Sequence, residues 1–237
     1  GSSERNYFTN VVTELVASEN ASLHHVKLQE ESPQASHISA TTVLQHAHSR
    51  LFTCSISVGG RLIRNDVKIR LDGEGCHCLM NGLVLARSRQ HVDNHTFISH
   101  DKPHCSSHQL YKGIYDGKSH GVFNGRIHVT KEGQKTDADQ TNKNLLLSKD
   151  ALVNSNPQLE INADDVRCTH GSTTGQIDEE ALFYLRTRGL ERRVAQMLLI
   201  RGFAHEIIDG IPSEVLRHYV DGTLGTWLSD MTRRETA

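Results

Sequence analysis

The chain has 237 residues, of which 26 are Lys or Arg and 28 are Asp or Glu. This length can bury a sizeable hydrophobic core, and the balanced charge excludes a generic nucleic-acid binder or a protein held on an anionic membrane by charge alone. No stretch approaches the roughly 20 apolar residues of a membrane-spanning helix. The five cysteines are irregularly spaced, which predicts free thiols in a reducing compartment.

Residues 24–174 are predicted to form a block of short β-strands, because apolar residues recur there at every second position. The clearest strand covers 52–58 and ends at Gly59-Gly60, which is a tight-turn signal. Further strands are predicted at 67–71, 77–86, 122–129, 145–147, 159–161 and 166–168.

Many short strands without intervening helices leave three architectures open: a sandwich, a barrel or a parallel β-solenoid. Asn81-Gly82 and Asn124-Gly125 are typical hairpin dipeptides. Both lie inside apolar segments, where corners along a coil are an equally good interpretation. No fixed repeat period is evident, so periodicity alone gives the solenoid only a small advantage.

Residues 175–237 have the spacing of helices. A first helix is predicted to begin after Asp178 and to stop at Gly189. A second helix is expected over 191–209, and a third begins near Pro212. The tail containing Trp227 is expected to dock or to fray.

The second helix has two adjacent apolar stripes, which together cover more than half of its circumference. Two interpretations carry equal weight. In one, a stripe packs on the neighbouring helices and the other on the end of the β block. In the other, one stripe binds a partner protein. The stripes are Ala195-Leu199-Phe203-Ile207 and Met197-Ile200-Ala204-Ile208.

A histidine-rich run covers residues 91–108. Histidines four residues apart share a face on a helix, but on a strand they lie about 13 Å apart, so a zinc site is disfavoured relative to histidines that form hydrogen bonds within the sheet. Cys54, Cys76 and Cys78 are interpreted as small buried apolar residues, and Cys105 is ambiguous.

Cys168 and His170 occupy alternate positions of the last predicted strand, so they share a face about 6.6 Å apart. Two ligands at that distance hold a single ion poorly, but both can contact an inorganic cluster or a ligand shared with a second chain. They are therefore a candidate half-site that a partner completes. Motifs for phosphate-binding loops, dinucleotide binding, nucleophile elbows and zinc proteases are missing from the sequence, so no self-contained active site is predicted.

Several segments, in fixed order between about residues 40 and 208, resemble the SufB/SufD family of iron–sulfur cluster assembly scaffolds. Within the family the sequence is most similar to the SufD branch, on the basis of 170–173 and 175–180. The matching segments are 64–75, 81–83, 91–96, 109–113, 121–127, 134–148, 157–161, 163–171 and 183–189.

The resemblance implies a right-handed parallel β-helix with a small C-terminal helical domain. Residues 1–23 would then be a tag scar, Gly1-Ser2-Ser3, and the remnant of an N-terminal helical region. Residues 24–174 would be the β-helix core, and 175–237 the domain that binds the ATPase. It also implies a location in a bacterial cytoplasm or a plastid stroma.

The function implied by the resemblance is that of a non-catalytic subunit of the SufBCD complex. Such a subunit pairs with SufB through the β-helix and with the SufC ATPase through the C-terminal helices. An iron–sulfur cluster then forms transiently at the SufB–SufD interface, and a flavin can bind the assembled complex at a place that no residue here identifies. The isolated chain is expected to hold no cofactor.

The same resemblance assigns roles to individual residues. His170, with Cys168 beside it, is expected at the cluster site, where neutral imidazole can bind iron together with ligands of the partner chain. The contact with SufC is expected to include Phe183, Tyr184, Met197, Ile200 and Phe203.

Two alternatives remain open at this stage. One is a β-helix enzyme that acts on polysaccharide, although aromatic residues make up only 5% of the chain and no paired carboxylates stand out. The other is a homodimeric scaffold of the SufB type. A homodimer of the isolated chain is also plausible, because an exposed edge of the β-helix can pair with a second copy.

Overall fold

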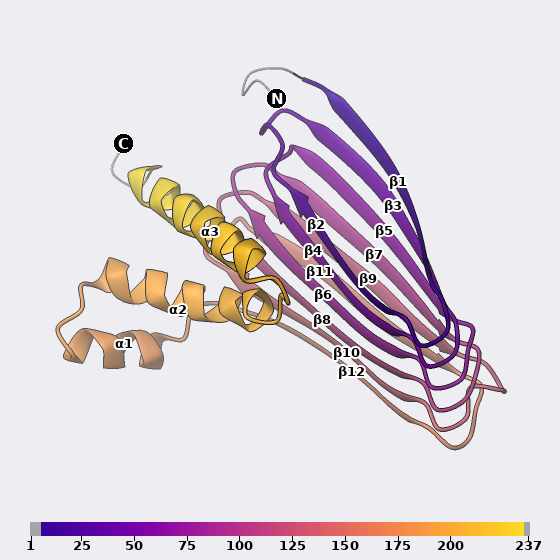
Figure 1. Ribbon diagram of the computed structural model, residues 1–237. Helices are drawn as coiled ribbons and strands as arrows, with labels where there is room; N and C mark the ends of the chain where they lie inside the picture. The colour runs from indigo at the N-terminus through magenta and orange to yellow at the C-terminus, as the bar shows by residue number, and fades with distance from the viewer. Residues whose placement is uncertain (1–5, 235–237) are drawn as a thin grey trace.

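The computed structural model describes residues 6–234, with side chains up to residue 231. Twelve strands alternate between two parallel six-stranded sheets, with orders β1-β3-β5-β7-β9-β11 and β12-β10-β8-β6-β4-β2. The chain is thus a flattened solenoid with two strands in each turn (Figure 1). The strands are β1 (Phe8–Ala17), β2 (Ser22–Gln29), β3 (Ser36–Gln45), β4 (Arg50–Val58), β5 (Leu62–Leu71), β6 (His77–Ala86), β7 (His91–His100), β8 (Ser106–Tyr115), β9 (His120–Val129), β10 (Asp137–Leu146), β11 (Leu152–Ile161) and β12 (Arg167–Gly175).

The predicted class, a mainly β parallel solenoid followed by helices, is confirmed. Successive turns stack in register, so that Leu62, His91 and His120 lie side by side in three neighbouring strands. The repeat is irregular, because the odd-numbered strands begin at residues 8, 36, 62, 91, 120 and 152. Spacings that drift in this way explain why no period is visible in the sequence.

The interior of the coil is filled by residues that alternate along each strand. Buried residues such as Val43, Ile69 and Ile98 from the odd-numbered sheet meet Met80 and Tyr111 from the even-numbered sheet. Burial of an aliphatic side chain of this size stabilises a fold by about 1.5–3 kcal/mol. The alternation that predicted the strands is therefore the pattern that builds this core.

The two Asn-Gly dipeptides form neither a hairpin nor a corner, the two interpretations left open by the sequence. Asn81-Gly82 lies inside β6 and Asn124-Gly125 inside β9. A Cβ at Gly82 would stand 2.3 Å from the Tyr111 ring, so the glycine makes room for the aromatic side chain of the next turn. The real corners use left-handed backbone, as at His48 (φ 57°) and at the equivalent His104 (φ 60°).

The solenoid begins earlier than predicted. β1 starts at Phe8 and pairs with β3 along its whole length, so the expected helical remnant over 1–23 is wrong from residue 8 onward. The adjacent Val11 and Val12 interrupt the alternation that marks the other strands, although β-branched residues favour a strand. The expected tag scar at 1–3 lies outside the described residues.

Three helices follow the strands: α1 (Glu179–Thr187), α2 (Arg192–Ile208) and α3 (Glu214–Arg234). Asp178 caps α1 by accepting hydrogen bonds from the backbone N–H groups of Glu180 and Ala181. No helix of the described chain combines the length and the apolar character needed to cross a membrane.

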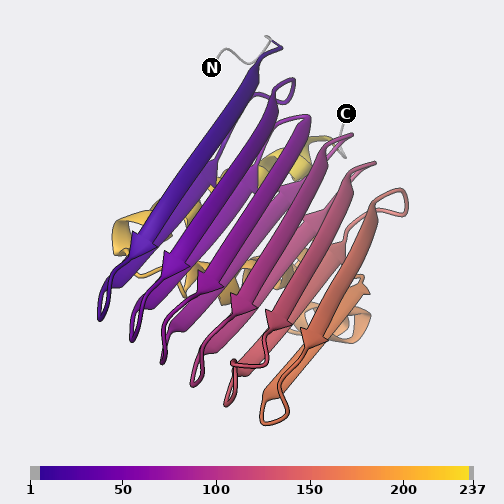
Figure 2. The ribbon, with the colours of Figure 1, turned by 90° about the vertical axis from the view of Figure 1, so that its right-hand side faces the viewer.

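Helices α2 and α3 pack on the outer face of the even-numbered sheet, not on the end of the β block as one interpretation expected (Figure 1). This face is apolar because Phe52, Cys54 and Ile56 of β4 point outward together with Leu83 of β6. The tail docks, since Trp227 is buried in this layer as part of α3. None of the three described helices covers the outer face of the odd-numbered sheet (Figure 2).

A buried lysine fixes α2 on the sheet. The Lys112 side chain donates a hydrogen bond to the carbonyl oxygen of Phe203 at 2.8 Å and is ion-paired with Glu206. The ammonium also lies 4.0 Å from the centre of the Phe203 ring. Lys143 binds the same carboxylate at 3.1 Å. The C-terminal end of α2 is therefore held on the sheet by ion pairs as well as by apolar packing.

Candidate functional site

The last turn of the solenoid is an open edge in both sheets. Within residues 6–234, β11 pairs only with β9, and β12 pairs only with β10. The backbone N–H and C=O groups on the free side of each strand have no strand to bind, which makes the edge a surface for a further strand. Pro157, in the middle of β11, lacks an N–H group and fits such an edge position.

Cys168 and His170 lie on β12 at this edge. They stand opposite Ala138 and Gln140 of β10, both of which are buried and face the interior of the coil. The two candidate residues therefore share one face, as their alternation predicted, and the structure shows that this face points into the coil. His170 is exposed, and β12 is the outermost of the described strands in its sheet.

The two side chains have different surroundings. Cys168 is half-buried against a small apolar cluster that includes Ile127 and Ala138. Partial burial, and then the charge of Asp137, raises the pKa of the Cys168 thiol, although a hydrogen bond with the backbone of Ala138 opposes the shift. The thiol is thus protonated at neutral pH and becomes a thiolate ligand only when a metal ion displaces the proton.

His170 has no hydrogen bond or ion pair with any described residue, so its ring nitrogens are free to bind a metal or a partner. In the part of the chain that the structure describes, no group of three or more His, Cys, Asp or Glu side chains could hold a metal ion. Ligands from a second molecule would therefore be needed to complete a metal or cluster site at Cys168 and His170.

The histidine-rich run does not converge on one point. His95 lies 3.0 Å from a carboxylate oxygen of Asp93, and the buried His100 is hydrogen-bonded to Ser107 at 2.8 Å. His108 is hydrogen-bonded to Asp139 in the neighbouring strand. These contacts agree with histidines that support the sheets. Cys76, Cys78 and Cys105 are buried in the solenoid core, and Cys54 is buried beneath the helices.

The predicted partner-binding residues of the helices fall into two groups. Phe183 and Tyr184 on α1 are 67% and 56% exposed, whereas Met197 and Phe203 on α2 are half-buried. Ile200 is 0% exposed and packs in the core beneath α2, so it cannot contact a partner in this arrangement.

Sequence reasoning missed two exposed apolar residues on α2. Val194 and Leu198 are 40% and 47% exposed, and they share one face because they lie four residues apart. That spacing was visible in the sequence as a third stripe of the helix. These two residues and the α1 residues Phe183 and Tyr184 are called the outer helical surface below. Figure 1 shows α1 projecting beyond the sheets.

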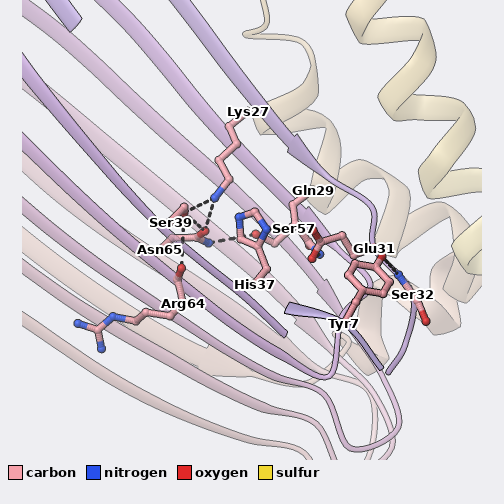
Figure 3. A network of polar contacts seen from close by, with 10 residues as sticks. All are labelled: Tyr7, Lys27, Gln29, Glu31, Ser32, His37, Ser39, Ser57, Arg64 and Asn65. Carbon is pink, nitrogen blue, oxygen red and sulfur yellow. Dashed lines mark hydrogen bonds and ion pairs between the residues drawn. The ribbon is translucent and has the colours of Figure 1, made fainter. Parts of the chain in front are cut away.

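A network of polar side chains around one lysine lies inside the first turns. The Lys27 ammonium donates hydrogen bonds to Ser39 and, at 2.6 Å, to the Asn65 side-chain oxygen (Figure 3). Asn65 in turn donates to Ser57 at 3.2 Å and to Asn94 at 2.9 Å. Burial lowers the pKa of Lys27 to about 8, and the Glu31 charge opposes this shift. These groups bind one another, so we interpret them as a structural network.

Comparison with known proteins gives a consistent picture. Residues 1–203 match the family model described as SUF system FeS cluster assembly, SufBD core domain. Over 219 residues the chain is 38% identical to the iron-sulfur cluster assembly protein SufD of Escherichia coli (strain K12), and the match covers 92% of this chain and 52% of the relative.

Two further relatives come from a cyanobacterium and a plant. The chain is 38% identical over 206 residues to an iron-sulfur cluster assembly SufBD family protein of Synechocystis, covering 87% of this chain and 46% of the relative. It is 37% identical over 212 residues to Protein ABCI7, chloroplastic, of Arabidopsis thaliana, and this match covers 89% of this chain and 45% of the relative. The chain thus spans about half the length of the curated relatives it matches.

Proposed function

We propose a scaffold role for this chain, which belongs to the SufBD core-domain family of SUF-system iron–sulfur cluster assembly proteins and is SufD-like within it. In this proposal it pairs with a SufB-like paralogue through the solenoid and with a SufC-like ATPase through its helices, and it has no turnover of its own. Family membership gives no support to the alternative of a polysaccharide-active enzyme.

The open edge of the last turn is the observation that carries the proposal. Both sheets end there at the same place, so a paralogue with the same architecture can extend both by adding strands to β11 and β12. The contact would bring the interior-facing Cys168 and His170 against the partner. Backbone hydrogen bonds would supply the pairing, and these two side chains would face the shared interior.

We assign the cluster, as cargo rather than as a resident cofactor, to this contact. The free imidazole of His170 is a suitable iron ligand, and the Cys168 thiol lies on the same face about 6.6 Å along the strand. Because neither residue can hold an ion alone, the remaining ligands would come from the SufB-like chain. The cluster would then depend on the assembled pair and not on either chain separately.

The outer helical surface is the proposed site for the SufC-like ATPase. Its four apolar residues are 40–67% exposed, two of them on α1, which projects beyond the sheets, and two on the first half of α2. Apolar side chains exposed together are typical of protein contacts. The proposed contact also includes Met197 and Phe203, which are half-buried, but it does not include the buried Ile200. The sources of the relatives, a bacterium and a chloroplast, are compatible with a cytoplasmic or plastid location.

The proposal can be tested with Gly171→Arg, a change in the middle of β12. A Cβ at Gly171 meets no atom within 4 Å, so the isolated chain should fold. Gly171 alternates with His170 and faces outward, where an arginine would crowd the side chains of a strand added beside β12. Light scattering coupled to size-exclusion chromatography should show that the variant loses the SufB-like subunit and keeps the SufC-like ATPase.

Gly222→Arg on α3 is the matched control, because its Cβ position is equally open and lies away from the edge. It should pair with the SufB-like subunit as wild type does. Normal pairing by Gly171→Arg would refute the edge contact. A homodimer of the isolated wild-type chain that Gly171→Arg disrupts would instead show that the same edge also accepts a second copy.

A further inference from the structure

A cavity of about 820 Å³ lies between α3 and the turns that follow β2, β4 and β6. It is separate from the last turn, where Cys168 and His170 lie. Its volume falls within the range of small-molecule sites. The apolar part of its wall includes Pro33, Val58 and the ring of Trp227.

Two buried donors in the cavity wall have no partner. The Trp227 side chain is 3% exposed, and its indole Nε1–H binds no described residue. Arg87 donates from Nη2 to Asp230 at 3.0 Å, but its buried Nη1 is also unpaired. Buried donors without a partner are rare in folded proteins and usually mark a water molecule or a ligand.

Two more guanidinium groups line the same cavity. Arg61 and Arg89 are exposed, and their side chains form no hydrogen bond or ion pair with any residue that the structure describes. Four donor groups, from three arginines and one tryptophan, therefore remain for a ligand.

The acidic groups around the cavity are already engaged. Glu30 accepts hydrogen bonds from the hydroxyls of Tyr219 and Thr223, both at 2.7 Å. Glu31 interacts with His37 at 3.2 Å, and Asp230 is paired with Arg87. The neutral partners of Glu30 and Glu31 leave the negative charges of these two residues in place, so what the cavity leaves open is hydrogen-bond donation rather than net positive charge. The nearby carboxylates would repel a highly charged polyanion, so a ligand with one or two negative charges fits best.

We propose that this cavity binds a small molecule that joins an oxyanion, either a carboxylate or a phosphate, to an apolar group. The arginines and the indole N–H bind the oxyanion, and the apolar group packs on the Trp227 ring. Guanidinium groups suit both oxyanions because they donate parallel hydrogen bonds to two oxygens.

The chain has a single tryptophan, so its fluorescence reports directly on this cavity. We would titrate the 237-residue chain with benzoate and with phenyl phosphate, and use potassium chloride at matched ionic strength as the salt control. A saturable change with one or both probes is expected, and the stronger probe identifies the oxyanion. No saturable change with either probe would overturn the proposal and leave a cavity filled by water.

Arginine variants test the assignment of the donors. Arg61→Ala combined with Arg89→Ala removes two exposed, unpaired side chains. The probe concentration at the midpoint of the titration should rise by roughly tenfold in this double variant. Arg50→Ala, at the opposite end of β4, is the control and should leave the midpoint unchanged. Equal midpoint concentrations in the double variant and the control would contradict the assignment of Arg61 and Arg89 to the ligand site.

A second readout does not depend on fluorescence. A ligand that binds only the folded chain raises its Tm. Trp227→Phe keeps an aromatic ring but removes the indole N–H, so the increase in Tm caused by the stronger probe should be smaller in this variant than in wild type. An increase of the same size would exclude Trp227 as a donor to the ligand.

Discussion

Among the described strands, β1 and β2 form one outer edge of the solenoid and β11 and β12 form the other, yet the interior-facing polar groups near the two edges differ. In the first turns, Lys27 and Asn65 bind each other and their neighbours Ser39, Ser57 and Asn94. In the last turn, His170 binds no described residue. Polar groups that pair within the coil stabilise it, whereas a polar group left unpaired at a fixed position is free to act on another molecule.

The largest effect should separate the two ends by stability. Asn65→Leu removes one of the two acceptors of the Lys27 ammonium and leaves a buried charge with less support, which should cost about 3 kcal/mol of unfolding free energy. His170→Leu, a similar change at the other end, should stay within about 0.5 kcal/mol, because the side chain is exposed and unpaired. Urea unfolding measures both, and similar losses would remove the distinction between the two ends.

A pH series sharpens the same comparison. Because burial lowers the Lys27 pKa from 10.5 to about 8, the unfolded chain binds more protons than the folded chain between these two pH values. The free energy of unfolding of wild type should therefore rise across that window relative to Lys27→Met, by up to about 3 kcal/mol. Urea unfolding of both proteins at several pH values tests this, and a constant difference would show that Lys27 is not buried as described.

The helices repeat the contrast on a smaller scale. Leu198→Asp changes an exposed residue of α2 and should leave the fold intact. It should lower the affinity for the SufC-like ATPase by roughly tenfold, because part of an apolar contact is lost. Ile200→Asp, two residues away, places a charge in the core and should unfold the helical layer. Calorimetric binding and circular dichroism separate these outcomes. Unchanged binding of Leu198→Asp would exclude this face.

Part of this architecture could be predicted from alternation alone. Strand β4 was visible because Phe52, Cys54 and Ile56 recur on one face that the helices cover. The start of the solenoid was missed because Val11 and Val12 break the pattern in β1. The coil itself needed the family resemblance, since its repeat drifts and several of its corners lack a glycine signal.

The candidate sites were predictable to different degrees. The shared face of Cys168 and His170 follows from the two-residue period of a strand, but the open edge beside them depends on where the stacking of turns ends. On α2 the apolar positions extend around most of the helix, so the sequence could not show that Ile200 is buried and Leu198 exposed. The cavity at Trp227 joins segments more than a hundred residues apart, which no local pattern reveals.

The central claim is that the last turn supplies one part of a cluster site shared with a second chain. The most direct test is the iron and sulfide content of the complex with SufB-like and SufC-like subunits, measured after reconstitution and a chelator challenge. His170→Ala should leave the complex assembled but weaken retention of the cluster by roughly tenfold or more. His24→Ala, on β2 at the opposite edge of the same sheet, should behave as wild type. Full retention of the cluster by His170→Ala would contradict the account.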